Sequence, residues 1–289
     1  MPSTQALKGR IRSVKSTKQI TKAMELVAAS KMRRAQDATK ASSPYTLAAR
    51  QLLTALSTHT SVKGHPLFVQ RPVKTRLLIV IASDKGLAGA FNSNLAKVYT
   101  HALKKDDDEG IKNTTITVGR KAAQFVARIK DTKVLGAYED LPDRPDGSEL
   151  RAILDTTKSL FTSGEVDAVD VIFTDYASSV SQHAKIQRVL PAGFEPAVEP
   201  GVARDVIYEP STEEVLDGVA YRLVGAQLYQ ALLDSRASEY SMRMVAMKNA
   251  TDNASDLIDD LTLEMNKARQ SAITQELAEI SGGVEAMHD

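Results

Sequence analysis

The sequence of 289 residues lacks cysteine and tryptophan, and aromatic residues make up only 5% of it. Without cysteine there can be no disulfide framework, no thiolate metal site and no thiol redox switch. No apolar run approaches the ~20 residues that a membrane-spanning helix needs, and residues 1–15 contain no apolar core of a signal peptide. We therefore expect a protein of a cytosolic or matrix-like compartment that does not cross a bilayer.

Proline and glycine, the chief terminators of helices, are missing from long stretches near both ends of the chain. Neither occurs between Arg10 and Ser43, and residues 211–281 contain no proline and only Gly218 and Gly225. These absences predict one long helix at each end. Pro44 is the expected break in the first helix, with further helix to residue 59 and a turn at residues 64–66.

The C-terminal segment carries apolar residues at alternating steps of four and three, the repeat of a left-handed coiled coil. A helix from about residue 212 to 281 would be roughly 105 Å long, well beyond the ~40 Å diameter of a compact domain of this size. Much of it should therefore extend beyond any globular body. From Tyr240 onwards the expected seam consists of Met244, Met247, Thr251, Ala254, Ile258, Leu261, Met265, Ala268 and Ala272.

The N-terminal helix carries a weaker apolar stripe, which Lys18 and Glu25 interrupt. Ile20, Met24 and Val27 form a second apolar edge beside it. A helix with two apolar edges can contact its coiled-coil partner on one edge and another protein on the other. The members of the main stripe are Leu7, Ile11, Val14, Thr21, Ala28, Met32 and Ala35.

The net charge of +1 hides opposite charges at the two ends of the chain. Residues 1–40 carry ten basic and two acidic side chains, a net +8, and residues 211–289 carry six basic and fourteen acidic, a net −8. Pairing between the two helices, an acidic protein partner and a solvated helix face each account for the basic segment. Nucleic acid is a further option, but the segment has no interleaved aromatic residues and its charges surround the helix, so we expect none.

The centre of the chain alternates short apolar runs with helical patterns, which predicts an open α/β sheet. Buried strands are expected at residues 76–83, 114–118 and 169–174, and an edge or antiparallel strand at 185–190. Helices are expected at 94–105, 121–130 and 149–163. The acidic run at residues 106–109 is interpreted as a solvated loop and not as a metal site.

The segment Ser83–Asn92 follows a strand and precedes a helix, where glycine-rich loops bind phosphates in other proteins. It matches neither the GxGxxG nor the GxxxxGK[ST] pattern, so a tight structural turn is the preferred interpretation and nucleotide binding the alternative. The five histidines have no metal-ligand spacing, and no active-site motif is present. We expect no catalytic residue, no cofactor and no metal.

Four blocks of the sequence closely resemble the gamma subunit of F-type ATP synthase, namely residues 18–33, 83–92, 244–253 and 266–280. They occur in the family's order and lie at both ends and in the middle, so the likeness spans essentially the whole chain. Ala88 stands where the family often has cysteine, and Val284 follows Gly283 where the family usually has alanine. The resemblance implies an α/β protein with a long antiparallel coiled coil of the N- and C-terminal helices plus a central Rossmann-like α/β domain. The corresponding segments are 1–60, 70–195 and 211–289.

The resemblance also implies a non-catalytic central rotor that couples ion flow through a membrane sector to ATP synthesis or hydrolysis. Its implied partners are three alpha and three beta subunits per copy, the epsilon subunit and the c-ring, at the cytoplasmic face of a bacterial plasma membrane. The implied contacts with beta subunits are Lys22, Met24, Arg269, Gln270, Thr274 and Glu276, and those on the c-ring side are Tyr208 and Glu209.

Two other functions are compatible with the residue patterns taken alone. One is a free-standing coiled-coil interaction protein with an α/β binding head. The other is an enzyme that holds a nucleotide at Ser83–Asn92.

Overall fold

The computed structural model describes residues 3–57, 64–130, 132–143, 145, 147–178, 181–193 and 212–285. It divides into two compact units, one of residues 1–28 with 244–289 and the other of residues 29–243. Among the described helices, none combines the length and the apolar character that a membrane span requires. The helices are α1 (Thr4–Ser57), α2 (Phe91–Asp108), α3 (Arg120–Val126), the 3-10 helix η1 (Ser148–Leu150), α4 (Arg151–Thr162) and α5 (Thr212–Glu285).

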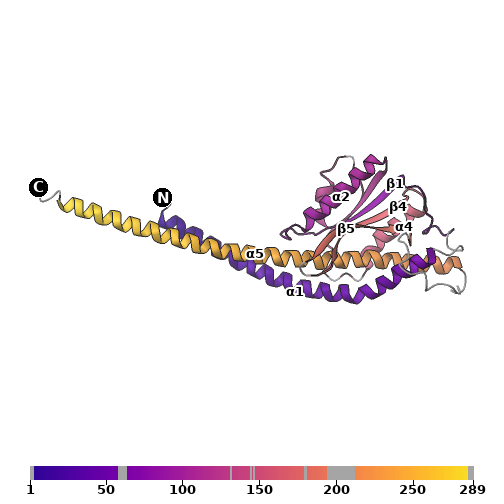
Figure 1. Ribbon diagram of the computed structural model, residues 1–289, viewed down its shortest axis with the longest axis horizontal. Helices are drawn as coiled ribbons and strands as arrows, with labels where there is room; N and C mark the ends of the chain where they lie inside the picture. Colours follow the sequence, from indigo (N-terminus) through magenta and orange to yellow (C-terminus); the bar gives the residue numbers. More distant parts are fainter. Residues whose placement is uncertain are drawn as a thin grey trace. The chain divides into compact units, whose positions relative to one another are not determined.

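In the unit of residues 29–243, five strands form one sheet in the order β3-β2-β1-β4-β5 (Figure 1). The first four are parallel to one another, and β5 runs antiparallel to β4 at an edge. The strands are β1 (Thr75–Ile81), β2 (Lys112–Val118), β3 (Lys133–Tyr138), β4 (Ala168–Tyr176) and β5 (Gln182–Leu190). The predicted strands are confirmed, including the antiparallel edge. Strand β3 was not predicted, because a partly exposed edge strand lacks the continuous apolar run of a central one.

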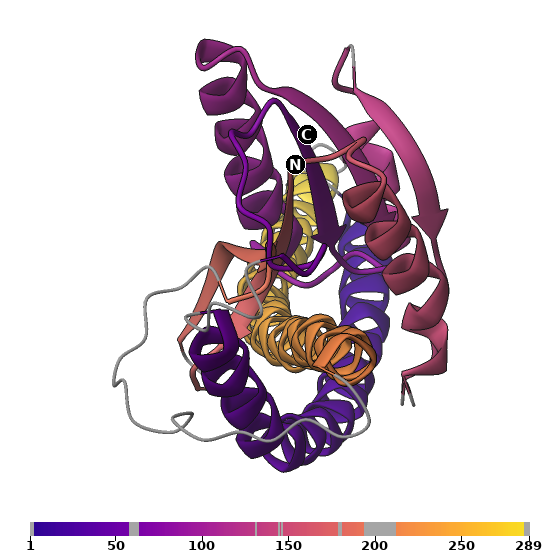
Figure 2. The same cartoon turned by 90° about the vertical axis from the view of Figure 1, so that its right-hand side faces the viewer.

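Both faces of the sheet are covered. Side chains alternate along a strand, so Leu78 and Val80 of β1 pack with α2 and α3, whereas Leu77 and Ile79 pack with α4 and with parts of α1 and α5. In Figure 2, α2 and α4 lie on opposite sides of β1. This burial on two faces explains why the sequence of β1 is apolar without alternation.

The expected break at Pro44 is wrong, because α1 continues through it to Ser57. A proline inside a helix removes one backbone hydrogen bond. The turns that follow compensate for that loss, since Ala49 and Leu53 are buried in the core of the unit. Tertiary packing therefore outweighs the local preference of the proline.

The interpretation of residues 106–109 as a solvated loop is also wrong for the first of these residues. Asp106 lies in the last turn of α2 and is fully buried, with its Oδ1 3.0 Å from Nη1 of Arg76. Nε of Arg76 lies 3.2 Å from Asp170. Burial raises the pKa of Asp106, and the charge of Arg76 partly offsets this rise.

Helix α3 is shorter than predicted, since it ends at Val126 instead of continuing to residue 130.

The unit of residues 1–28 and 244–289 contains two antiparallel helix segments. Leu7 and Ile11 of α1 pack on Leu261 of α5, and the Thr251 hydroxyl hydrogen-bonds that of Thr21 at 2.8 Å. Low-numbered residues of α1 thus meet high-numbered residues of α5. The antiparallel pairing expected from the resemblance is present in this unit.

The predicted seam of α5 is confirmed from Met247 to Ala268, where every predicted position is buried or half-buried. Ala272 is exposed, and its placement on the seam is wrong, because α1 begins at Thr4 and cannot follow α5 that far. The second apolar edge of α1 is also confirmed as separate from the seam, since Ile20 and Val27 are 58% and 56% exposed.

Ion pairing between the oppositely charged ends is not what holds this unit together. Its described residues contain one ion pair, between Lys22 and Glu25, and both belong to α1. The two helix segments are joined instead by the apolar seam and the hydrogen bond between the threonines. The exposed basic side chains of α1 therefore keep their charge available to another molecule.

Replacing Leu261 by aspartate tests the seam, because it places a charge at a position that is only 8% exposed. We expect a loss of about 3 kcal/mol or more in the local stability of the helix pair. Hydrogen exchange within residues 4–28 and 244–268 should accelerate by about two orders of magnitude. Leu263→Asp is the matched control, since Leu263 lies two residues away and is 75% exposed. Equal exchange in both variants would contradict the seam.

Candidate functional site: the coiled-coil surface and the filled crevice

The residues predicted to contact partners near the N-terminus lie on the surface of α1. Lys22 is exposed, and its Nζ lies 3.1 Å from both carboxylate oxygens of Glu25. Met24 is half-buried beside it. Tyr208 and Glu209, predicted for the c-ring side, lie outside the described residues.

The predicted contacts near the C-terminus all lie exposed on α5, at or beyond the end of the seam. Arg269, Gln270, Thr274 and Glu276 belong to successive turns, and the Thr274 hydroxyl donates to the carbonyl of Gln270 at 2.9 Å. Exposed apolar side chains accompany them, which is unusual for a solvated helix end. These are Ile273, Leu277 and Ile280, with 50%, 60% and 63% of their surface accessible.

The structure therefore separates the predicted contacts into two groups. Lys22 lies next to Thr21, which meets Thr251 of α5, whereas Arg269 lies 18 residues farther along the same helix. That interval corresponds to roughly 27 Å at 1.5 Å per residue. A protein that surrounds this unit would meet the two groups at different depths.

The second candidate site is the crevice at the carboxyl ends of the parallel strands in the unit of residues 29–243. Open α/β folds bind ligands there, at the point where the strand order reverses, which in this sheet is between β1 and β4. Strand β4 pairs with β1 only as far as Ile172. Beyond it, Ser235 of α5 accepts the N–H of Thr174 at 3.1 Å, and Ser238 donates to its carbonyl at 3.3 Å. Helix α5 thus occupies the crevice.

Residues 231–241 of α5 are buried around the whole circumference of the helix. The heptad pattern predicted a single apolar stripe there and missed this burial. The missed signal is a cluster of small and charged residues without the polar outer face of an ordinary amphipathic helix. Its polar members are Asp234, Ser235, Arg236, Ser238, Glu239 and Ser241.

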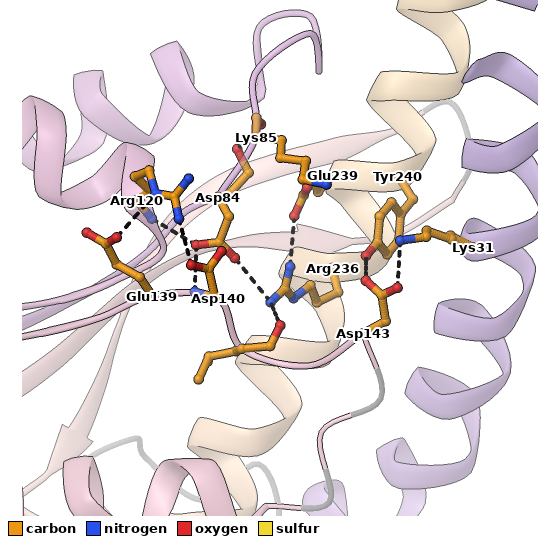
Figure 3. Close-up of polar contacts among 12 residues, drawn as sticks. Lys31, Asp84, Lys85, Arg120, Glu139, Asp140, Asp143, Arg236, Glu239 and Tyr240 are labelled. Carbon is orange, nitrogen blue, oxygen red and sulfur yellow. Dashed lines mark hydrogen bonds and ion pairs between the residues drawn. The ribbon is translucent and has the colours of Figure 1, made fainter. Parts of the chain in front are cut away.

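Asp84, shortly after β1, connects three loops at this edge of the sheet (Figure 3). Its Oδ1 accepts the backbone N–H of Arg120, after β2, at 3.0 Å and that of Asp140, after β3, at 3.1 Å. Its Oδ2 lies 3.7 Å from Nη2 of Arg236 on α5. One carboxylate therefore links the ends of β1, β2 and β3 to the helix in the crevice.

Arg236 and Arg243 extend this network along α5. Arg236 also donates to the carbonyl of Leu141 at 2.9 Å, and its Nη1 lies 3.6 Å from Glu239. Glu239 in turn lies 2.7 Å from Nη1 of Arg243. Two backbone carbonyls of the Ser83–Asn92 segment accept hydrogen bonds from Arg243, those of Lys85 at 2.9 Å and Gly86 at 3.2 Å.

The Ser83–Asn92 segment is a closed turn, as the preferred interpretation predicted. The Ser83 hydroxyl donates to the carbonyl of Lys85 at 2.7 Å, and the amide of Asn92 donates to Ser83 at 2.8 Å. Leu87 and Gly89 adopt positive φ angles of 60° and 54°. The glycine-rich sequence thus allows a tight turn of the backbone, and carbonyls of this turn face the guanidinium of Arg243.

A third connection joins α5 to α1 within the same unit. Nζ of Lys31 on α1 lies 2.6 Å from Asp143, which also accepts the hydroxyl of Tyr240 on α5 (Figure 3). Nζ of Lys31 lies over the ring of Tyr240, 5.6 Å from its centroid. Burial would raise the pKa of Asp143, but the hydrogen bonds from Lys31 and Tyr240 outweigh it and lower that pKa.

Asp234 is the buried carboxyl of α5 that has no basic partner within ion-pair distance among the described residues. Burial raises its pKa to about 6, although the hydrogen bond from Gln230 offsets part of this rise. Asp175 also raises the pKa, while Lys185 and Thr39 lower it. The unfolded chain ionises this carboxyl near pH 4, so stability falls as pH rises from about 4 to about 6.

Asp234→Asn should remove this pH dependence. We expect the variant and the wild type to be equally stable near pH 4, and the variant to be more stable at pH 7 by up to about 3 kcal/mol. Urea unfolding followed by tyrosine fluorescence is the measurement, since all eight tyrosines lie within residues 29–243 and tryptophan is absent. Asp107→Asn, an exposed carboxyl on α2, is the control. A variant that is less stable than wild type at pH 7 would refute the assignment.

Comparisons with known proteins match the chain over nearly its whole length. A family model described as ATP synthase matches residues 3–287. The chain is 42% identical to an ATP synthase gamma chain of Opitutus terrae, over 97% of both chains. It is 40% identical to that of Stenotrophomonas maltophilia, over 99% of this chain and all of the other. Among solved structures, the central stalk and c-ring of a Tetrahymena thermophila mitochondrial ATP synthase matches with 26% identity and a TM-score of 0.64, covering 80% of this chain and 99% of that one.

Proposed function

Because this chain belongs to the family of ATP synthase gamma chains, it is a central-stalk rotor subunit of an F-type ATP synthase, and we propose that its helix pair enters the alpha–beta ring. One copy serves three alpha and three beta subunits, and the α/β part contacts the epsilon subunit and the c-ring. The observation that carries the proposal is the antiparallel helix pair, which forms a compact unit without the sheet.

The helix pair presents chemically different sides to its surroundings, and a rotor requires this asymmetry. Segment 4–28 of α1 exposes basic side chains together with Ile20 and Val27. Segment 244–285 of α5 instead exposes a row of carboxylates, at Asp252, Asp256, Asp259 and Asp260. Three identical beta subunits around such a shaft contact three different surfaces. Each catalytic site is therefore biased towards a different nucleotide affinity, and turning the shaft exchanges the three states.

We assign the beta-subunit contacts to Lys22 and Met24 on α1 and to Arg269, Gln270, Thr274 and Glu276 on α5. All of them except the half-buried Met24 are exposed, which supports the assignment, and so does the positive charge of α1, which has no ion-pair partner on α5 among the described residues of the unit. Electrostatic complementarity of this kind fixes orientation and the rate of association more than affinity. Tyr208 and Glu209 are assigned to the c-ring side from the resemblance alone.

We further propose that the chain has no catalytic site of its own, which the filling of the crevice by α5 supports. Its relatives in the bacteria Opitutus terrae and Stenotrophomonas maltophilia support a place at the cytoplasmic face of a bacterial plasma membrane. As functional parts we retain the segments 1–60, 70–195 and 211–289. Ion flow through the membrane sector, and not chemistry in this chain, then supplies the free energy.

The variant Met265→Pro tests whether the helix pair transmits torque. Proline removes a backbone hydrogen bond within α5 and disturbs a seam position that packs against the cluster of Leu7, Ile11 and Leu261. We expect ATP synthesis in vesicles that contain the complete enzyme to fall by about tenfold or more, since the two helices no longer form one rigid rod. Met265→Leu preserves the seam and should synthesise ATP at the wild-type rate. Undiminished synthesis by the proline variant would show that the pair transmits no torque.

Arg269→Ala tests the assigned contacts at the end of α5. Because Arg269 is exposed and lies outside the seam, its loss should leave the isolated chain as stable as the wild type, within about 0.5 kcal/mol. ATP hydrolysis by the complex with alpha and beta subunits should nevertheless fall by about fivefold or more, as expected for a lost charged contact. The neighbouring exposed Lys267→Ala is the control. If both variants hydrolyse ATP at equal rates, the assignment of Arg269 is wrong.

A further inference from the structure

The buried charges of α5 at residues 231–241 need an explanation beyond stability. Arg236 and Glu239 are only 8% and 4% exposed. Apolar side chains of similar volume often stabilise a buried site as well as an ion pair does, or better. The same segment already packs Leu232 and Leu233 into the interior. The charged residues therefore contribute something that additional apolar packing would not.

Their contribution is a defined position of the helix. Arg236 has partners on three different segments: Asp84 after β1, the carbonyl of Leu141 after β3, and Glu239 one turn along α5. Moving the helix by one residue turns it by 100° and shifts it by 1.5 Å. That movement would separate the guanidinium from Asp84 and from the carbonyl of Leu141, and it would leave the largely buried carboxylate of Asp84 without this basic partner. Apolar contacts are non-directional and tolerate such a movement far better.

The location of these contacts matters for a rotor. The partners of Arg236 lie on loops at the carboxyl edge of the sheet, and Asp84 ties those loops to one another through Arg120 and Asp140. Helix α5 continues without a break from residue 212 to 285. A force applied to the sheet and its loops therefore reaches α5 through this network (Figure 3).

Building on the rotor function proposed above, we propose that Arg236 and Asp84 form a torque-bearing joint, which prevents α5 from turning or sliding against the sheet under load, and that Glu239 orients Arg236 from one turn along α5. They are positioning residues and touch neither nucleotide nor ion. At low load the apolar packing of α5 holds the helix in place. Against a large opposing gradient the joint carries the torque, and without it the helix slips and ATP is hydrolysed without ion transport.

The test compares ATP hydrolysis with ion uptake in vesicles that contain the complete ATP synthase. Arg236→Met removes the charge but keeps a long side chain, and Arg222→Met is the control, since Arg222 is an exposed arginine of the same helix. Uptake of protons or sodium is followed, whichever the wild-type enzyme drives. Without a gradient both variants should hydrolyse ATP and take up ions like the wild type. As the opposing gradient grows, ions taken up per ATP should fall about threefold or more in Arg236→Met alone.

Two further variants separate a joint from a merely structural role. We define the limiting gradient as the largest opposing ion gradient against which the vesicles still take up ions. Glu239→Gln keeps the side-chain volume and removes one charge of the network, so it should lower the limiting gradient without changing the rate of ATP hydrolysis. This variant keeps the proposal testable even if Arg236→Met does not assemble. Arg236→Lys restores the charge but not the planar fork, and its limiting gradient should lie between those of Arg236→Met and wild type. The proposed joint would be refuted if Arg236→Met and Glu239→Gln both had the same limiting gradient as the control Arg222→Met. If the wild-type enzyme itself transported no ions, the rotor function would fail instead.

Discussion

The enclosure of α5 between residues 231 and 241 is the constraint on which the unit of residues 29–243 depends. A helix that is buried on every side must satisfy each of its polar groups within the protein. Here the partners are the free edge of β4 at Thr174, the loops after β1 and β3, and Lys31 of α1 acting through Asp143. Polar contacts therefore join α5 to the sheet, to the loops at one edge of the sheet and to α1.

This arrangement uses a known property of α/β folds for a different purpose. The crevice where the strand order reverses is usually open and receives a ligand. In this chain the crevice contains a helix of the chain itself, and Arg243 of α5 donates to two carbonyls of the glycine-rich turn. The crevice that binds ligands in other α/β folds holds a segment of α5 here.

The unit of residues 1–28 and 244–289 is held together by different interactions. Its seam is apolar apart from the hydrogen bond between Thr21 and Thr251. Its charges point outward, where they remain available to partners. Charged groups of α5 are thus buried at residues 231–241 in one unit, whereas Asp252, Asp256, Asp259 and Asp260 of the same helix are exposed in the other.

The sequence alone determined the elements whose signals are local and periodic. The heptad positions of α5 up to Ala268, the two apolar edges of α1 and four of the five strands follow from residue spacing, because helices and buried strands repeat at fixed intervals. The family resemblance rests instead on four blocks of sequence. The tertiary structure decided what depends on residues that are distant in the sequence. It continued α1 through Pro44, buried Asp106 beside Arg76 and added β3 at an edge. Above all, it surrounded residues 231–241 of α5, because burial on all sides depends on which other segments arrive there, and no periodicity records that.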